Sequence, residues 1–543
     1  MRMNLRDSHG HTCGFERFFC SSFWERYESA ILLGIIVVGL ALRLYGITLP
    51  FVDSHNIRQT QVAIVARNLY TDNMNILCTQ IDVFGKSPGC TIYEFPIVHS
   101  LAALLYYVFG IHDIIGRLLS VAFSVGALFL MHRLARLFLP SFPALGATTL
   151  YALSPTNIYF SRAFMPESSM MFFSVASLYF LLKWLSQPRP VLYFAATLFA
   201  GLTFLAKTPA GLVIVPLCCA WFVRFRWSVL RRVDFWAYVI LTLGPIAVWT
   251  VYGYEVNAQN LAMPDNWKYG AIIAGRGGLG VWFDPAFYIA MARSIIGVLL
   301  TPGGFLLSAA GLFVITPSLF RPVIYAWLGA IVVYFYALAG VNAGHVYYQL
   351  PLLPVAALLA GFALQYAFNR DDRPAWLRSV LTNRFLLAVA LVILIGHGVL
   401  YVKFFSYMYD PQLRMPYLLE VAKIIQSRTS ADSVLVVNQP NTAGLQPIAY
   451  YSHRKVVLFS VATGVEAIKG LETFRAQGGT TYVTLDTRYG SGMAESQRNE
   501  LFWRYLQERY TPIVVTEHYA IYDLANPKSQ SESGSVGTSR VAR

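Results

Sequence analysis

The chain has 543 residues, of which 56% are hydrophobic and only 13% are charged, against about 25% charged residues in an ordinary globular protein. Its mean hydropathy is +0.50. A soluble protein with so few charges cannot cover its surface, so most apolar residues are expected to face lipid or to lie inside a membrane bundle. The composition excludes intrinsic disorder, a coiled coil and a disulfide-rich secreted domain. We relate the net charge of +14 to membrane topology and expect no nucleic-acid partner.

Apolar runs of about twenty residues recur along the chain, as membrane-spanning helices require. Short basic loops or loops rich in Gly and Pro separate them. We expect eleven membrane spans, at residues 29–49, 114–139, 142–160, 168–185, 190–207, 210–223, 235–254, 303–316, 323–338, 347–367 and 385–402. Two shorter apolar stretches, 96–110 and 287–300, are expected to be interfacial or re-entrant helices, and counting them would give thirteen spans.

The basic residues predict the orientation, because cytoplasmic loops carry an excess of Lys and Arg. With the N-terminal segment 1–28 inside, seventeen basic residues lie inside and eight outside. The longest outside loops are then 50–113 and 255–302. Several arginines precede the first span, which lacks a small-residue cleavage site, so we expect a membrane anchor rather than a cleaved signal peptide.

The composition changes after the last expected span. Helix patterns at 417–428, 465–477 and 494–510 alternate with strand patterns at 434–438, 481–486, 513–517 and 519–524. We therefore expect an all-α polytopic membrane domain over residues 29–402 and a small extracytoplasmic α/β domain over residues 403–525. The tail 526–543, rich in Ser and Gly, is expected to be disordered.

The six cysteines add one structural candidate. Cys78 and Cys90 share the first outside loop, where an oxidising compartment would allow a disulfide. The sequence leaves that pairing open. No spacing of cysteines or histidines resembles a structural zinc site.

The expected spans contain few ionisable residues, whereas ion-coupled transporters carry such residues along their pathway. Charged residues gather instead in the first outside loop and around residues 162–167. A site there can take a lipid headgroup from the bilayer and present it to a second substrate. This distribution favours chemistry at the membrane surface. The alternatives are a lipid or solute transporter or flippase without covalent chemistry, and a non-catalytic assembly or receptor protein.

Two carboxylates bracket the first outside loop. Asp53 follows the first span, and Glu94 precedes Pro96 at the start of a short helix, where the helix dipole favours an anion. Residues 56–70 fit an amphipathic surface helix whose lipid-side face includes Arg58, a guanidinium suited to a lipid phosphate. Asp53 can instead cap a helix or pair with an arginine, and Arg58 can simply anchor the helix in the membrane.

The second outside loop carries a further acid and a further base. Glu167 follows Pro166 in the first turn of a span, where the helix dipole alone would stabilise a carboxylate. Arg162 can neutralise Glu167 or bind phosphate. The roles of both residues stay open on these grounds.

These residues resemble the integral-membrane glycosyltransferases of the GT-C fold, in the branch of the protein O-mannosyltransferases and the lipid A aminoarabinose transferases. The resemblance covers about residues 44–367. It rests on Asp53, Glu-Phe-Pro at 94–96, Ser-Arg-x-x-x-Pro-Glu at 161–167, Ala-Lys-Thr-Pro at 206–209 and His-Val-Tyr-Tyr-Gln-Leu-Pro at 345–351. Glu167 is a departure, since many relatives have Asp there.

The resemblance implies transfer of a sugar from a polyprenyl-phosphate donor to a lipid, glycan or protein acceptor at the outer face of a bacterial cytoplasmic membrane. The acceptor hydroxyl needs a base, and the departing phosphate needs cations. We expect Asp53 to be the general base, with Glu94 and Glu167 orienting Asp53, the acceptor or a divalent metal ion. Metal dependence stays open and no other cofactor is expected. The donor phosphate is expected at Arg58, Arg162, Lys207 and Tyr348.

Further substrate contacts are expected from side chains of the outside loops: His55, Trp267, Arg276, His345 and Tyr347. Each has a plain structural alternative. Lys207 can snorkel at a helix end, and the Tyr347–Tyr348 pair can belong to an interfacial aromatic belt. A histidine in such a loop can be hydrogen-bonded rather than bind a ligand.

Overall fold

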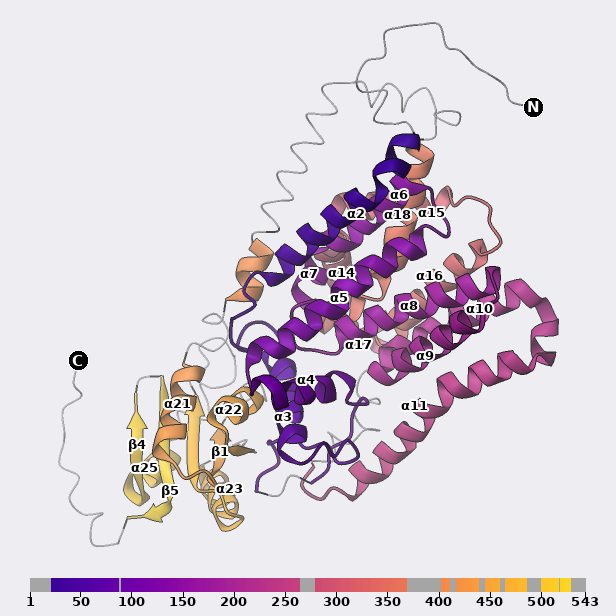
Figure 1. Cartoon of the computed structure of the whole chain (residues 1–543). Coiled ribbons are helices and arrows are strands. Elements are labelled where there is room, and N and C mark those ends of the chain that lie inside the picture. Colours follow the sequence, from indigo (N-terminus) through magenta and orange to yellow (C-terminus); the bar gives the residue numbers. More distant parts are fainter. Residues whose placement is uncertain are drawn as a thin grey trace, which may run out of the picture.

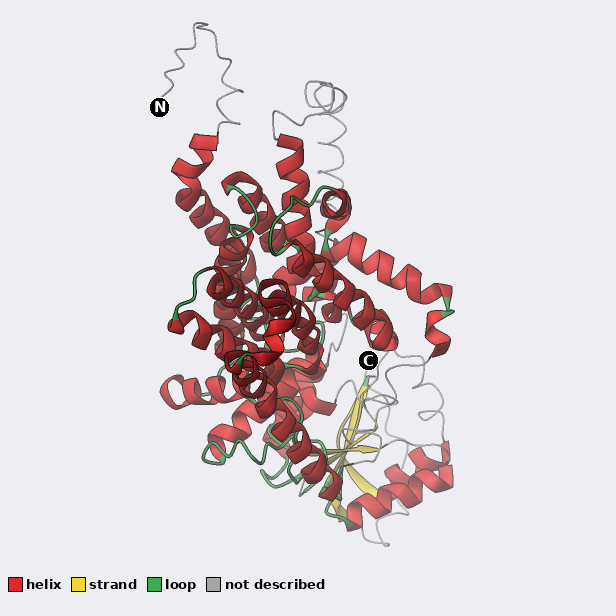
Figure 2. Cartoon of the chain, turned by 90° about the vertical axis from the view of Figure 1, so that its right-hand side faces the viewer, coloured by secondary structure: helices red, strands yellow, loops and turns green. Residues whose placement is uncertain are grey.

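The computed structural model describes residues 21–86, 89–263, 279–368, 401, 403–410, 417–438, 445–459, 464–485, 500–516 and 518–528. A helical bundle forms most of the molecule, and a small sheet domain lies at one end of it (Figure 1). Figure 2, turned by 90°, shows the same arrangement, with the strands beside one end of the helices. The expected fold class, an all-α polytopic membrane protein with a C-terminal α/β domain, is confirmed.

The bundle is built from helices of very different lengths. They are α2 (Ser21–Leu44), α3 (Asn56–Thr71), α4 (Ile97–Phe109), α5 (Asp113–Ala135), α6 (Ser141–Leu153), α7 (Pro155–Phe160), α8 (Glu167–Ser186), α9 (Pro190–Ala206), α10 (Ile214–Phe225), α11 (Val233–Gln259), α13 (Leu279–Trp282), α14 (Pro285–Ser294), α15 (Thr301–Phe313), α16 (Arg321–Ala337), α17 (Ala339–Gly344) and α18 (Leu352–Phe368). Short helical turns, η1 (Thr208–Val213) and η5 (Val346–Gln349), precede α10 and α18.

Five helices of the described part are long and apolar enough to cross a membrane: Phe23–Leu44, Asp113–Ala135, Glu167–Ser186, Ala210–Arg231 and Val233–Gln259. A sixth candidate is a broken pair, Pro285–Leu299 and Thr301–Phe313, bent by 102°. The remaining apolar helices have 10–17 residues: Ile97–Phe109, Pro190–Ala206, Arg321–Ala337 and Leu352–Ala367. The chain is therefore a multi-pass membrane protein.

The expected spans differ from these helices in identifiable ways. The stretch 142–160 is broken between α6 and α7, because Ser154 leaves the helix and caps the next one through its side chain. The stretches 287–300 and 303–316 are the two arms of the bent pair. The last expected span, 385–402, lies outside the described residues except for position 401.

The C-terminal domain contains a five-stranded sheet in the order β2-β1-β3-β5-β4. Strands β2 and β3 run parallel to β1, whereas β5 is antiparallel to β3 and β4. Its elements are α21 (Leu418–Arg428), β1 (Val434–Asn438), α22 (Leu445–Ser452), β2 (Lys455–Phe459), α23 (Gly464–Ala476), β3 (Thr481–Leu485), α25 (Glu500–Arg509), β4 (Tyr510–Val515) and β5 (Tyr519–Pro527). Helix α22 and strand β2 are not among the predicted elements.

The first outside loop and the C-terminal domain share one hydrophobic core. Val62 and Leu69 of α3, Tyr106 of α4, and Ile448 of α22 are buried in the same cluster. The predicted helix at 56–70 is therefore present, but its apolar face packs against protein rather than against lipid. This packing brings the C-terminal domain close to the loop that carries Asp53 and Arg58.

A disulfide joins Cys78 and Cys90. Asn260, just after α11, donates a hydrogen bond to the Cys90 carbonyl at 2.8 Å. The loop is thus closed covalently and held against the end of a membrane-spanning helix.

Candidate functional site

The charged residues predicted from separate loops meet in two neighbouring clusters beside the start of α3. The Asp53 cluster consists of Asp53, Gln59, Arg117 and Arg162. The paired-charge cluster consists of Arg58, Glu94, Glu167, Lys207, Tyr347 and Tyr348. His55 follows Asp53 by two residues, and the centroid of its ring lies 5.0 Å from that of Tyr347 in the paired-charge cluster.

Asp53 is fully buried and both of its carboxylate oxygens accept hydrogen bonds. Gln59 donates to Oδ1 at 2.7 Å, while Arg117, at 3.4 Å, and Arg162 donate to Oδ2. Two guanidinium groups therefore compensate the charge of Asp53. An ion pair is one of the alternatives that the sequence leaves open for this residue.

Arg117 and Arg162 also bind the chain that follows α2. Arg117 donates to the carbonyls of Leu49 and Pro50 at 3.1 and 3.0 Å, and Arg162 donates to that of Gly46 at 2.5 Å. Cations suit the carbonyl-rich C-terminal end of a helix. The two arginines thus fix the segment that leads from α2 to Asp53.

The Arg58–Glu94 ion pair is the more accessible part of the paired-charge cluster. The Arg58 side chain is 22% exposed and that of Glu94 is 12% exposed. Burial raises the pKa of Glu94, but the positive charge of Arg58, with smaller contributions from His99 and Lys207, outweighs burial and lowers the pKa overall. Glu94 is therefore a carboxylate near neutral pH.

The Lys207–Glu167 ion pair is the more buried part. Its side chains are 9% and 1% exposed. The Lys207 ammonium lies 4.7 and 4.8 Å from the ring centroids of Tyr347 and Tyr348, so it also makes cation–π contacts. Glu167 Oε2 is buried and has no hydrogen-bond partner in the described part of the chain.

Helix ends position the members of the paired-charge cluster. Arg58 lies in the first turn of α3, and Glu94 precedes α4. Glu167 is the first residue of α8, as Pro166 predicts, and Lys207 is the extended residue between α9 and η1. Tyr347 and Tyr348 lie in η5. Every charged group of the cluster thus lies at a helix end or next to one.

The histidines predicted to contact substrate lie against the same cluster. His55 and His345 have ring centroids 5.8 Å apart, and His345 lies 5.4 Å from the Tyr347 ring. Among the described residues, no group of three or more His, Cys, Asp or Glu side chains can hold a metal ion. The predicted Trp267 and Arg276 lie outside the described residues.

Two residues of the Asp53 cluster were not predicted. Arg117 is a charge inside an apolar run, which by itself marks a functional or structural polar contact in a membrane protein. Gln59 follows Arg58 within α3, and no sequence signal distinguishes it from other polar helix residues.

The comparisons with known proteins agree on the architecture. Residues 94–253 match the family described as dolichyl-phosphate-mannose-protein mannosyltransferase. The fold is similar to that of ArnT from Cupriavidus metallidurans bound to undecaprenyl phosphate, with a TM-score of 0.58, 15% identity and coverage of 94% of this chain and 100% of ArnT. The chain has the GT-C fold. No curated protein sequence matches it significantly.

Two other structures with this fold come from different organisms. The Archaeoglobus fulgidus oligosaccharyltransferase in the apo form has a TM-score of 0.57 and 13% identity, over 86% of this chain and 70% of that enzyme. The arabinofuranosyltransferase AftD from Mycobacteria has a TM-score of 0.53 and 15% identity, over 91% of this chain and 41% of AftD. The ArnT match covers 94% of this chain, so the structural similarity extends beyond the membrane helices into the C-terminal part.

Proposed function

We propose that this GT-C protein is a glycosyltransferase that moves a sugar from a polyprenyl-phosphate donor to a lipid, glycan or protein acceptor. The observation that carries the proposal is the paired-charge cluster, assembled from residues at or beside four separate helix ends of a GT-C membrane protein. The matched family is named for a dolichyl-phosphate-linked sugar, and ArnT binds undecaprenyl phosphate. We place the site at the outer face of a bacterial cytoplasmic membrane, with the N-terminus inside.

Donor binding would change the ion pairs of the paired-charge cluster. Arg58 and Lys207 are paired with Glu94 and Glu167 without ligand, so the cluster holds two cations and two carboxylates. A donor phosphate that binds Arg58, Lys207 and the Tyr348 hydroxyl would compete with the carboxylates for the cations. The same cations would then stabilise the phosphate as it leaves.

The transfer step forms one bond and breaks one bond. The acceptor oxygen attacks the anomeric carbon, the bond from that carbon to the phosphate oxygen breaks, and the electron pair leaves with the polyprenyl phosphate. The acceptor proton goes to a carboxylate, which we assign to Asp53. Because Gln59, Arg117 and Arg162 occupy its oxygens, one of these bonds must open first. Glu94 and Glu167 are the alternative bases, and Glu167 Oε2 is unpaired in the described part.

Transfer by the purified chain in lipid nanodiscs tests the proposal. Synthetic polyprenyl-phosphate sugars serve as donors, and mass spectrometry detects released polyprenyl phosphate and the glycosylated product. We expect Asp53→Asn to be less stable, because the buried Arg117 and Arg162 lose their carboxylate partner. Per folded molecule, its transfer should fall by a factor of about 10² to 10⁴, the usual contribution of a general base. Asp72→Asn is the matched control, since Asp72 is exposed just beyond the other end of α3.

Each other outcome has a distinct meaning. Near-normal transfer by Asp53→Asn would remove the assignment of the base, and parallel loss in Glu94→Gln or Glu167→Gln would move it to that residue. Direct displacement inverts the anomeric configuration, so retention in the product NMR spectrum would require a covalent intermediate.

Movement of the donor across vesicle membranes without covalent change would favour a flippase. Comparing lipid-linked saccharides and envelope glycans of a deletion strain with its parent would identify sugar and acceptor.

A further inference from the structure

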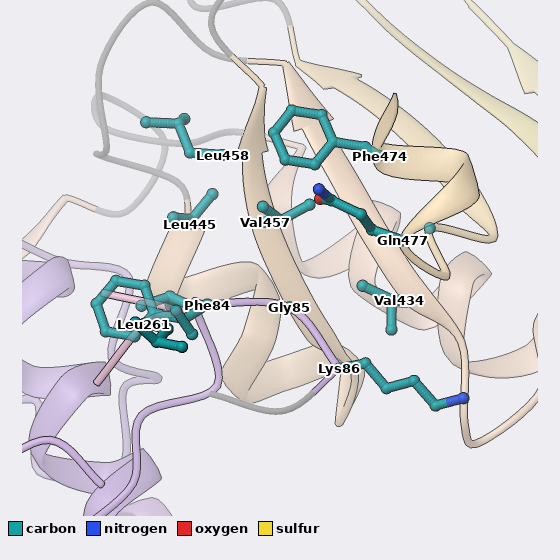
Figure 3. Close-up of a pocket in the computed structure, with 13 residues that line it drawn as sticks. Phe84, Gly85, Lys86, Leu261, Val434, Leu445, Val457, Leu458, Phe474 and Gln477 are labelled. Carbon is teal, nitrogen blue, oxygen red and sulfur yellow. The ribbon is translucent and has the colours of Figure 1, made fainter. Parts of the chain in front are cut away.

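The C-terminal domain is joined to the first outside loop by backbone and side-chain hydrogen bonds. Residues 82–85 of the loop lie along the edge strand β2: Val456 donates to the Asp82 carbonyl at 2.8 Å, and Gly85 donates to the Val456 carbonyl at 2.9 Å. Phe84 and Val457 form an antiparallel bridge. Figure 3 shows this loop segment beside the strand, and residues of both line a cavity of about 560 Å³. The loop therefore extends the sheet of the domain.

Two adjacent tyrosines of α22 make a second connection. The hydroxyls of Tyr450 and Tyr451 donate to Oδ1 and Oδ2 of Asp113, at 2.8 and 2.6 Å. Asp113 is the first residue of α5, a membrane-spanning candidate. One carboxylate thus connects the C-terminal domain to the membrane bundle.

The Tyr451 hydroxyl makes a hydrogen bond that the Tyr450 hydroxyl lacks. The Tyr451 hydroxyl oxygen also accepts a hydrogen bond from the backbone N–H of Phe51 at 2.5 Å. Phe51 is fully buried, two residues before Asp53. A single hydroxyl group therefore links the start of α5, the C-terminal domain and the segment that carries Asp53.

The rest of that segment is held from the other side. The Ser54 N–H donates to the Met408 carbonyl at 3.0 Å, and the Ser54 carbonyl accepts from Tyr159 at 2.8 Å and from Gln59 at 2.9 Å. Asp53 lies between the two anchored peptide groups. Of these anchors, only Tyr451 comes from the α/β part of the C-terminal domain, between Leu418 and Pro527.

We infer that Tyr451 is a positioning residue for Asp53, and that positioning this segment is one task of the C-terminal domain. The inference rests on the proposed function, in which Asp53 takes part in sugar transfer. Tyr451 does not touch the reacting atoms. It acts by fixing the backbone before Asp53, and misplacing a reacting group by about 1 Å costs about 10²-fold in rate.

Tyr451→Phe and Tyr450→Phe form a matched pair for the test. Each variant removes one hydroxyl and one hydrogen bond to Asp113, but only Tyr451→Phe leaves the Phe51 N–H without its acceptor. We expect Tyr451→Phe to lower kcat by about 10- to 100-fold with an unchanged KM for the polyprenyl-phosphate sugar. We expect Tyr450→Phe to retain kcat and to have a similar melting temperature. Amide hydrogen exchange should accelerate at residues 51–59 in Tyr451→Phe alone.

Equal kcat values and equal exchange at residues 51–59 in the two variants would overturn the inference. If Tyr451→Phe does not fold, amide hydrogen exchange of the wild-type chain in mild denaturant tests the inference instead. Residues 51–59 and α22 should then lose their protection from exchange at the same denaturant concentration. Loss of protection at different concentrations would overturn the inference. A wild-type chain that transfers no sugar contradicts the proposed function. The exchange comparison still decides the positioning role in that case.

Discussion

At the scale of single residues, the site is a set of buried charges that compensate one another. Asp53 has two arginine partners, while Glu94 and Glu167 have one cation each. Removing one member of a buried pair is costly, by about 3–5 kcal/mol, because the other charge is left without compensation. The charged residues are therefore coupled, and each substitution reports on its partner as well as on itself.

The Arg58–Glu94 pair makes this coupling measurable through pH. Because the pKa of Glu94 is lowered in the folded chain, the pair stabilises the fold above the unfolded-state pKa of about 4.3, and this stabilisation is lost as the pH falls through the folded-state pKa. In Arg58→Met the buried carboxylate loses its main cation, so its folded-state pKa rises above the unfolded value. Acid should then stabilise the variant relative to wild type.

Melting temperatures between pH 4 and pH 8 check this prediction. The difference in melting temperature between wild type and Arg58→Met should be largest near neutral pH and should become smaller as the pH falls. The double variant Arg58→Met/Glu94→Gln, which lacks both charges, should differ from wild type much less at neutral pH. A pH-independent difference for Arg58→Met would show that Arg58 does not control the ionisation of Glu94.

At the scale of elements, small residues allow the close packing of the apolar helices. A Cβ atom added at Gly311 of α15 would overlap the carbonyl group of Leu359 in α18, whereas one added at Gly303 of the same helix would meet no atom within 4 Å. Backbone cannot move aside as a flexible side chain can. The contact between α15 and α18 therefore requires glycine at position 311.

Gly311→Ala and Gly303→Ala are thus a matched pair on one helix. We expect Gly311→Ala to lose about 1–3 kcal/mol of stability through overpacking, despite the better helix propensity of alanine. Gly303→Ala should be neutral or slightly stabilising. Thermal unfolding in detergent measures both variants, and equal stabilities would contradict the close approach of α15 to α18.

The elements also show how far the sequence predicts the structure. Local signals were sufficient at Pro166, which predicts the start of α8. They were also sufficient for β1 and β3, which short runs rich in β-branched and aromatic residues predict. They failed for the break at Ser154, where polar capping overrides an apolar run. The bend between residues 299 and 301 agrees with the prediction of a re-entrant or interfacial helix at 287–300, separate from the stretch 303–316. Strand β2, Lys-Val-Val-Leu-Phe, carried a β-branched signal that the prediction did not use.

The candidate site shows the same division between local and long-range information. The sequence predicts that Glu94, Glu167 and Lys207 lie near one membrane face, because each residue is next to the predicted end of a helix on that face. It does not predict the partner of each charge: Arg117 is 64 residues from Asp53 in sequence. Such pairs depend on how the helices pack against one another. The sequence does not contain this packing, so several cations remain possible partners for each carboxylate.

At the scale of the whole molecule, helix α8 and the disulfide support the proposed orientation in the membrane. Helix α8 begins at Glu167 in the paired-charge cluster and ends at Ser186, about 30 Å away along its axis, which equals the thickness of the hydrocarbon core. The loop that contributes Glu94 to the same cluster holds the Cys78–Cys90 disulfide, and disulfides persist in oxidising compartments. Both features fit the proposal that this loop and the C-terminal domain lie outside and Ser186 lies inside.

Single cysteines test this orientation in sealed right-side-out vesicles, in a background in which Cys13, Cys20, Cys218 and Cys219 are replaced by alanine. Val465→Cys probes the C-terminal domain, where Val465 is 70% exposed, and Gln187→Cys probes the exposed turn after α8. A membrane-impermeant maleimide should label Val465→Cys at once and Gln187→Cys only after the vesicles are opened. Labelling of both in sealed vesicles would contradict α8 as a membrane span. The reverse pattern would place the site at the cytoplasmic face and reject transfer at the outer face.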